Sequence, residues 1–312
     1  MTEFELIREI IPGLASNDQV VVGAGDDCAV LEMGDPVWLT LFKTDAVVQG
    51  VHFVASTEPQ RVGHKALARC LSDVAAMAGT PVAAVITLGL PKDFDPAYVL
   101  GIYAGINALA RRHGVAVVGG ETTVNAGGVL ISVALIGTVP RERLLLRSHA
   151  KVGDAILVTG VLGGSLSGKH LDFEPRLAEA RWLAEHFKIH ALMDISDGLA
   201  GDLPHILGGS SVGGDLLSDA IPISREAKLR AKEGADAKPP LLAALTDGED
   251  FELLFTVPSR LAVPVMDAWR VKFPELKLSC VGRVTAKPGL RLASKLGAKP
   301  MPLHGYDHFA QS

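Results

Sequence analysis

The chain has 312 residues, of which 48% are hydrophobic and 21% charged, and its formal net charge is -5. This balance is typical of a globular protein of about two domains, and it argues against nucleic acid, whose phosphates require a basic surface. Three cysteines, Cys28, Cys70 and Cys280, suggest no disulfide framework and favour a reducing compartment. The N-terminus is too charged for a signal peptide, and no apolar run reaches the ~18 residues that span a bilayer. We therefore expect a cytoplasmic protein without a membrane partner.

The first half of the chain predicts a β-rich region with two long helices. Residues 3–11 have the pattern of a short amphipathic helix, which Pro12-Gly13 would end. Helical spacing of apolar residues predicts a second helix over 61–79, and a third over 96–113 ends with Arg111, Arg112 and the following Gly114. The remaining apolar runs read as strands and are QVVVG, VWLTLF, AAVITLGL and GVLISVALIGTV.

The character of the chain changes near RSHAKVGD. Strand-like runs (AILVTG, ALMDIS, DFELLFTV and LSCVGRV) alternate there with helical stretches near 176–187, 198–207, 224–233 and 260–272. Such alternation predicts a mixed α/β layer. We therefore expect two domains, 1–148 and 149–312, and an α/β (α+β) fold class. The segments 208–219 and GADAKPP read as loops.

Acidic residues recur at the ends of the apolar strands, next to Gly, Ser or Thr. They are Asp26, Asp27, Asp45, Asp73, Glu121, Asp194, Asp197, Glu249 and Asp250. Hard oxygen ligands without a set of His or Cys companions suit Mg²⁺, Ca²⁺ or Mn²⁺ rather than zinc. Each acid alone also fits a cap or turn, and Asp197 could simply start the helix near 198. Together they favour a site where metal ions meet phosphate.

One stretch imitates a phosphate-binding loop. Gly163 to His170 (GGSLSGKH) nearly matches G-x-x-x-x-G-K-[ST], but His170 stands where a hydroxyl should bind Mg²⁺. Pro175 leaves little room for the helix that such a loop requires. We expect no P-loop here and no cysteine nucleophile, because no cysteine has a recognisable catalytic setting.

A set of motifs in this order resembles the thiamine-monophosphate kinases. They are GAGDDCAV, TDAVVQGVHF, LSDVAAMAGTP, GGETT, RSHAKVGDAILVTGVLGGS, MDISDGLAGDL, DGEDFELLFT and GYDHF. The resemblance spans nearly the whole chain and places it in the PurM-like superfamily, beside aminoimidazole ribonucleotide synthetase, selenophosphate synthetase and HypE. It implies a two-domain PurM-like fold, with a β-rich N-terminal domain for ATP and dimerisation and a mixed α/β C-terminal domain. It also implies ATP-dependent phosphorylation of thiamine monophosphate to thiamine diphosphate by direct, Mg²⁺-assisted transfer, and a homodimer that binds ATP near its interface.

The resemblance also implies roles for individual residues. It assigns no catalytic side chain, because positioning and charge neutralisation do most of the work of phosphoryl transfer. The implied metal ligands are Asp26, Thr44, Asp45, Asp73, Glu121, Asp194 and Asp197, with Asp27 nearby as a turn residue or outer neighbour. The implied ATP contacts are Gly120, Glu121, Arg147 and Ser196. The implied thiamine monophosphate contacts are His52, Glu249 and Phe309.

Three departures from the motif pattern bear on function. Glu121 stands where Asp is usual, Lys43 stands where a small polar residue is usual, and the segment near 165–176 is short. Two other functions therefore stay open: another PurM-like ATP-dependent synthetase, and a nucleotide- or metal-binding homologue without turnover.

Overall fold

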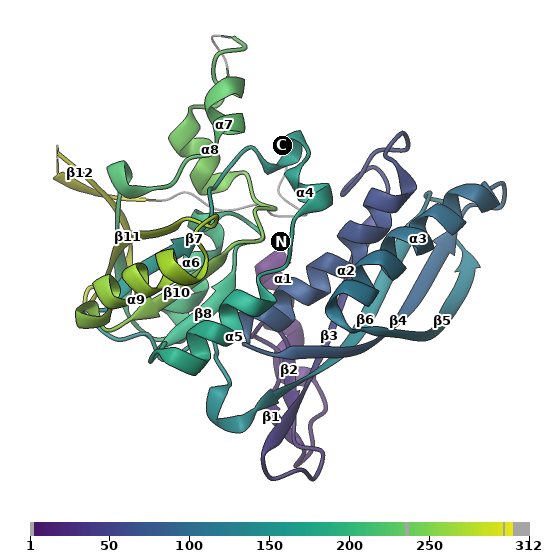
Figure 1. Cartoon of the computed structure of the whole chain (residues 1–312), viewed down its shortest axis with the longest axis horizontal. Coiled ribbons are helices and arrows are strands. Elements are labelled where there is room, and N and C mark those ends of the chain that lie inside the picture. Colours follow the sequence, from purple (N-terminus) through teal and green to yellow (C-terminus); the bar gives the residue numbers. More distant parts are fainter. Residues whose placement is uncertain (1–2, 235–236, 296, 302–312) are drawn as a thin grey trace. The chain divides into compact units, whose positions relative to one another are not determined.

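The computed structural model describes residues 3–234, 237–295 and 297–301, which fall into two compact units (Figure 1). The first, here called the N-terminal unit, comprises Asp18–Leu144 and Gly168–Arg181. The second, the C-terminal unit, comprises Met1–Asn17, Leu145–Ser167 and Trp182–Ser312. The division expected near residue 148 lies close to Leu145, where the chain first passes from the N-terminal to the C-terminal unit. Neither unit is one continuous stretch of chain.

The N-terminal unit is built on a six-stranded sheet with the order β1-β2-β3-β6-β4-β5. Its strands are β1 (Val20–Val22), β2 (Ala29–Leu31), β3 (Trp38–Val48), β4 (Thr80–Leu90), β5 (Ala116–Val124) and β6 (Leu130–Pro140). All neighbours pair antiparallel except β4 and β5, which run parallel and are therefore joined by a helix. The long β3–β6 ladder fixes which side chains of β3 share a face, because strand residues alternate between the two faces.

Two helices, α2 (Pro59–Ala76) and α3 (Pro96–His113), lie side by side on one face of this sheet (Figure 1). Both were expected, and α3 has the expected ends: Asp95 accepts a capping bond from the backbone N–H of Ala97, and Gly114 ends the helix with a φ of 70°. Leu67, Leu71 and Val74 of α2 are fully buried. These helices therefore cover the inner face of the sheet with its apolar core.

The outer face of the same sheet is apolar but largely exposed. Phe42 pairs with Ile136 across β3 and β6, and Val85 of β4 faces the same side. These three side chains are 40–48% exposed within this chain. An apolar sheet face of this kind is normally covered by another layer.

The segment 168–174 is fastened to the helices of the N-terminal unit by side chains. Arg61 Nε donates to Asp172 at 2.9 Å, and His64 Nε2 lies 2.8 Å from the carbonyl oxygen of Phe173. His113 Nε2 lies 2.9 Å from Glu174 Oε1, and this contact lowers the pKa of Glu174. The segment includes α4 (Lys169–Asp172) and leads into α5 (Leu177–His186).

The C-terminal unit holds a seven-stranded sheet among its described residues, with the order β13-β12-β9-β11-β7-β10-β8. Its strands are β7 (Ala155–Thr159), β8 (Ala191–Asp194), β9 (Gly213–Leu217), β10 (Leu253–Val257), β11 (Leu278–Thr285), β12 (Gly289–Ser294) and β13 (Gly297–Pro300). Its helices are α1 (Glu3–Ile10), α6 (Leu199–Gly209), α7 (Arg225–Arg230), α8 (Pro240–Thr246) and α9 (Ser259–Lys272). Short 3₁₀ turns are η1 (Ile11–Gly13), η3 (Ser165–Ser167) and η4 (Ser218–Ala220), and η2 (Arg141–Arg143) belongs to the N-terminal unit.

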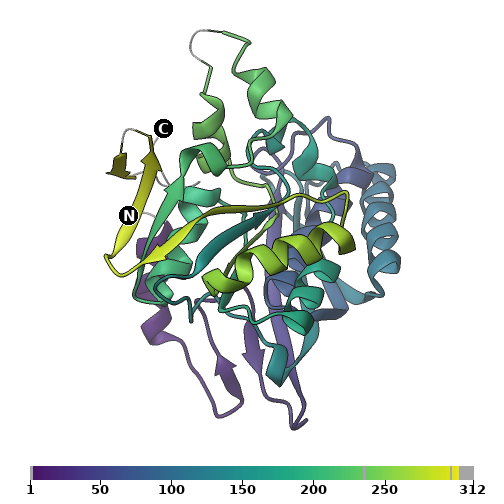
Figure 2. The ribbon, with the colours of Figure 1, turned by 60° about the vertical axis from the view of Figure 1, so that its left-hand side comes forward.

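Helix α6 packs its apolar side on one face of this sheet, where Leu203 and Ile206 join Ile156, Met193 and Leu254 in one buried cluster. Helix α9 contacts β11 and crosses the sheet in Figure 2. The mixed α/β fold class is thus confirmed. Among the described helices, none has both the length and the apolar character that crossing a bilayer requires.

One expectation about this unit was wrong. The segment 208–219 was expected to be a loop, but it contains strand β9. Its first residues are Gly213 and Gly214, which have low strand propensity. The fold requires them, because a Cβ on Gly213 would lie 1.7 Å from the carbonyl oxygen of Lys287. The close approach of the turn between β11 and β12 requires glycine there, so strand propensity alone gave the wrong prediction. Part of GADAKPP lies outside the described residues.

Candidate active site

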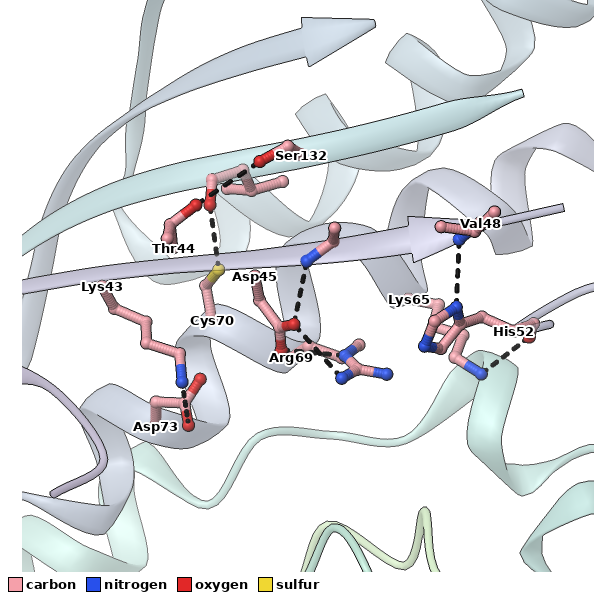
Figure 3. Close-up of polar contacts among 12 residues, drawn as sticks. Lys43, Thr44, Asp45, Val48, His52, Lys65, Arg69, Cys70, Asp73 and Ser132 are labelled. Atoms are coloured by element: carbon pink, nitrogen blue, oxygen red, sulfur yellow. Dashed lines mark hydrogen bonds and ion pairs between the residues drawn. The ribbon is translucent and has the colours of Figure 1, made fainter. Parts of the chain in front are cut away.

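Strand β3 carries three consecutive candidate residues, and its alternation separates them. Lys43 and Asp45 point toward α2, whereas Thr44 points to the outer face, where its Oγ1 lies 3.4 Å from Ser132 Oγ (Figure 3). The hydroxyl of Thr44 therefore does not share the face of Asp45. A contact from Thr44 to a ligand on the inner face would use its backbone carbonyl.

Helix α2 presents a cation and an anion to these strand residues. Arg69 and Asp73 are four residues apart and so lie on one helix face. Arg69 Nε donates to Asp45 Oδ2 at 2.9 Å and its Nη2 donates to Asp45 Oδ1 at 3.2 Å, while Lys43 Nζ lies 3.1 Å from Asp73 Oδ1 (Figure 3). Burial would raise the pKa of Asp45, but Arg69 and then Lys43 outweigh it and the pKa is lowered. Asp45 is therefore an anion held by two side-chain cations.

The Gly-Asp-Asp turn delivers a further carboxylate to this cluster. Gly25 has a φ of 122°, and Asp26, half-buried, accepts a bond from the backbone N–H of Asp27 at 3.0 Å. Asp27 is 1% exposed, and one of its carboxylate oxygens lies within 4.8 Å of one from Asp73. Sequence reasoning ranked Asp27 below Asp26. Its burial beside Asp73 makes Asp27 a full candidate ligand.

Asp27 and Asp73 offer the oxygen ligands that Mg²⁺ prefers, since one carboxylate oxygen of each lies within 4.8 Å of the other. We call Asp27, Asp45 and Asp73, together with Lys43 and Arg69, the α2 charge cluster.

Glu121 and Gly120 belong to β5, beside a pocket of about 570 Å³ between β5 and Tyr103 and Asn107 of α3. Gly120 pairs with Ile86 in the parallel β4–β5 ladder. A Cβ on Gly120 would lie 1.8 Å from the carbonyl oxygen of Ile86, so no larger residue fits. Glu121 is exposed, and its Oε1 accepts a bond from the backbone N–H of Thr122 at 2.9 Å.

His52 is oriented by the backbone at the end of β3. Its Nδ1 accepts a bond from the N–H of Val48 at 3.0 Å, so the neutral ring carries its proton on Nε2. Lys65 Nζ donates to the carbonyl oxygen of His52 and to His170 Nδ1, both at 2.8 Å (Figure 3 shows the contact to His52). Lys65 is fully buried. Sequence reasoning missed Lys65, whose only signal was a charge on the apolar face of a helix.

In the C-terminal unit, β8 ends at Asp194, and the chain turns through Ser196 and Asp197 into α6. Asp194 is 3% exposed. The N–H of Asp197 donates to Asp202 Oδ2 at 3.0 Å, so Asp202 binds the backbone just before the helix. Burial, and then the charges of Asp197 and Asp194, raise the pKa of Asp202, while Arg147 opposes them. Three carboxylates and Arg147 thus influence one another here, and Asp202 was missed although it lies on the buried side of a predicted helix.

The loop after α8 contains Glu249, whose φ is 55° and whose N–H donates to the carbonyl oxygen of Ser196 at 2.6 Å. The structure therefore brings two candidate residues, Ser196 and Glu249, together within the C-terminal unit. Phe309 lies outside the described residues.

Other acids of this loop explain why the P-loop match is false. The N–H of Gly163 donates to both oxygens of Asp250 at 3.0 Å, and the N–H of Gly164 donates to Asp247 Oδ2 at 2.9 Å. A P-loop needs such amides for phosphate. Here carboxylates of the same unit bind them, which agrees with the expectation that no P-loop exists.

Comparisons with known protein families also divide the chain between residues 139 and 151. The model of the AIR synthase related protein N-terminal domain matches residues 25–139, and that of the C-terminal domain matches residues 151–295. The chain thus has both domains of this class of protein.

Relatives with a known name identify the family within this class of protein. A thiamine-monophosphate kinase of Rhodopirellula baltica is 37% identical over 93% of this chain and 92% of its own, and one of Escherichia coli is 33% identical over 99% and 98%. A solved structure described as AaThiL complexed with AMPPCP and TMP has a TM-score of 0.83 at 32% identity, covering 99% of this chain and 97% of its own. The chain belongs to the thiamine-monophosphate kinase family, which confirms the resemblance seen in the motifs.

Proposed function

We propose that this protein transfers the γ-phosphoryl group of ATP to thiamine monophosphate and releases thiamine diphosphate and ADP. An oxygen of the acceptor phosphate attacks the γ-phosphorus, the bond to the bridging oxygen breaks, and ADP leaves with the electron pair. The observation that carries the proposal is the near-complete overlap, in sequence and in fold, with a kinase whose structure is described with an ATP analogue and TMP.

The residues of each unit have properties that suit parts of this reaction. Asp27 and Asp73 in one unit, and Asp194 and Asp197 in the other, are the groups that would hold Mg²⁺. The bound metal would neutralise the charge of the triphosphate. Asp26, Thr44 and Glu121 complete the proposed ligand set, while Asp45 is bound by Arg69 in this structure.

Substrate contacts are proposed for residues that the structure orients. The N–H of Val48 binds His52 Nδ1 and so directs the ring proton to Nε2, and the backbone of Glu249 is bonded to that of Ser196. Gly120, which lines the pocket between β5 and α3, is proposed to contact ATP together with Arg147 and Ser196. Phe309 is proposed to pack on the thiamine.

The test is a chromatographic assay for thiamine diphosphate with ATP, Mg²⁺ and thiamine monophosphate. We expect product that requires all three and that is abolished by EDTA. Absence of product with tight binding of AMPPCP would favour the second candidate, a binding protein without turnover. One observation favours that candidate: Lys43 occupies an oxygen of Asp73.

We further propose a homodimer that pairs the outer faces of the two N-terminal sheets. The exposed apolar side chains of Phe42, Val85 and Ile136 support it, since a second copy is the economical cover for a flat apolar face. Ile136→Glu should shift the protein from dimer to monomer in light scattering, whereas Val271→Glu on the exposed side of α9 should not. A wild-type monomer at all micromolar concentrations would contradict the dimer. The expected cytoplasmic location stays a prediction.

A further inference from the structure

Two cations of this chain occupy carboxylates of the proposed metal site. Lys43 lies in the middle of β3 and points at α2, where its Nζ meets Asp73 Oδ1 at 3.1 Å. The two side chains are only 24% and 10% exposed, so neither is a loose surface group. Arg69 meanwhile binds Asp45 with two nitrogens, and these side chains are 15% and 21% exposed.

The side chain of Lys43 brings a positive charge to this cluster, because lysine is ordinarily charged at neutral pH and its Nζ lies 3.1 Å from Asp73 Oδ1. Arginine keeps its charge at any physiological pH. The α2 charge cluster thus contains three carboxylates and two permanent cations.

A divalent ion and these side chains cannot share the same oxygens. Mg²⁺ binds oxygen at about 2.1 Å and requires near-octahedral space around it. An ammonium group 3.1 Å from Asp73 Oδ1 fills that side of the oxygen and repels a second cation. Arg69 does the same along both oxygens of Asp45, because its planar fork matches a carboxylate. One carboxylate oxygen of Asp73 lies within 4.8 Å of one from Asp27, a spacing that a metal ion can bridge.

We propose that the side-chain cations of Lys43 and Arg69 take the positions at Asp73 and Asp45 where divalent ions would otherwise bind. With nucleotide bound, this protein therefore binds fewer metal ions than it would without these two side chains. This proposal rests on the proposed Mg²⁺-assisted phosphoryl transfer. In this arrangement the two side chains supply positive charge that does not depend on the free metal concentration.

The test counts bound metal without turnover. Mn²⁺ is titrated into the full-length protein with saturating AMPPCP, and free Mn²⁺ is followed by electron paramagnetic resonance. We expect the Lys43→Ser/Arg69→Ser variant to bind at least one more Mn²⁺ per chain than the wild type. The charge-retaining Lys43→Arg/Arg69→Lys variant should keep the wild-type number.

Arg61→Ser is the matched control, because it removes a positive charge from the same helix at an exposed pair with Asp172. It should bind the wild-type number of ions. An equal Mn²⁺ count in the wild type and in the double Ser variant would overturn the proposal. If the double variant does not fold, Lys43→Ser alone decides in the same way.

Thermal melting gives a second readout. Adding Mn²⁺ should raise the melting temperature of the Ser variant more than that of the wild type, because an added ion replaces the lost charge. Equal shifts would count against the proposal. The proposed function fails separately, if the wild type makes no thiamine diphosphate, since the Mn²⁺ count needs no turnover.

Discussion

Particular acidic residues of the two units are held by different means. In the α2 charge cluster, Asp45 and Asp73 are paired with the side chains of Arg69 and Lys43. In the loop after α8, Asp250 is bound by the backbone N–H of Gly163. A side chain can move or be replaced by an ion, but a backbone amide in a folded loop stays where it is. The contrast therefore separates acids that can exchange partners from acids that fasten the chain.

The strongest test of this contrast is Asp73→Asn, which keeps the shape but removes a charge. We expect kcat/KM for thiamine diphosphate formation to fall on the order of 100-fold or more, because charge neutralisation at the transferred group contributes several kcal/mol. The free energy of unfolding should also fall, by up to about 3 kcal/mol, because the largely buried Lys43 loses its partner. Activity at the wild-type level would reduce Asp73 to a structural residue.

A change where the backbone binds Asp250 should lower the stability of the fold rather than the activity. Gly163 has a φ of 80°, and an added Cβ would lie 2.6 Å from the backbone nitrogen of Ala244. Gly163→Ala should therefore cost about 3 kcal/mol of unfolding free energy, measured by urea denaturation. Gly208→Ala is the control, since α6 has open space there and alanine favours a helix. A stable Gly163→Ala protein would show that the loop is not rigid.

Asp247 combines the two means, since the side chains of Lys238 and Arg230 and the N–H of Gly164 all bind it, and it gives a pH-dependent test. Burial raises its pKa, but Lys238, the N–H of Gly164 and Arg230 outweigh burial and lower it. A lowered pKa stabilises the fold above the unfolded pKa of about 3.9, and this contribution is lost as the pH falls through the folded pKa. Asp247→Asn should thus lose about 2 kcal/mol at pH 7 and almost nothing at the acid end of the range. The exposed Asp267→Asn should follow the wild-type curve throughout, and parallel curves for Asp247→Asn and the wild type would contradict the assignment.

The smallest effect is expected at Glu121, which is exposed and bonded to the next backbone N–H. Glu121→Asp should keep kcat within about threefold, because the neighbouring glycines let the strand adjust. Glu121→Ala should lower Mg²⁺-dependent turnover by about tenfold, because it removes a charge that balances metal beside ATP. Unchanged Mg²⁺ dependence in the Ala variant would remove Glu121 from the site.

The sequence predicted those structural features that depend on residues close together along the chain. The apolar periodicity, Arg111 and Arg112 in the last turn, and Gly114 were enough to place α3 at its observed ends. Pairings between distant elements were not predictable: Gly163 and Asp250 are 87 residues apart, and nothing local indicates that they bond. The pairing of Lys43 with Asp73 was hidden for the same reason, although Lys43 stood out as unusual in its motif. Strand β9 was missed because its glycines have low strand propensity and are required there by a close contact with residues far along the chain.

The segment 168–174, fastened to α2 and α3, has a consequence for how the protein is made. Synthesis on the ribosome runs from the N-terminus, so Arg61 and His64 emerge about a hundred residues before their partners Asp172 and Phe173. The N-terminal unit therefore cannot complete its contacts while the first 148 residues alone are outside the ribosome. The N-terminal unit can complete its contacts only after residues 168–174, which follow the first part of the C-terminal unit in the chain, have been synthesised. A fragment that ends near residue 148 should therefore be a substrate for chaperones.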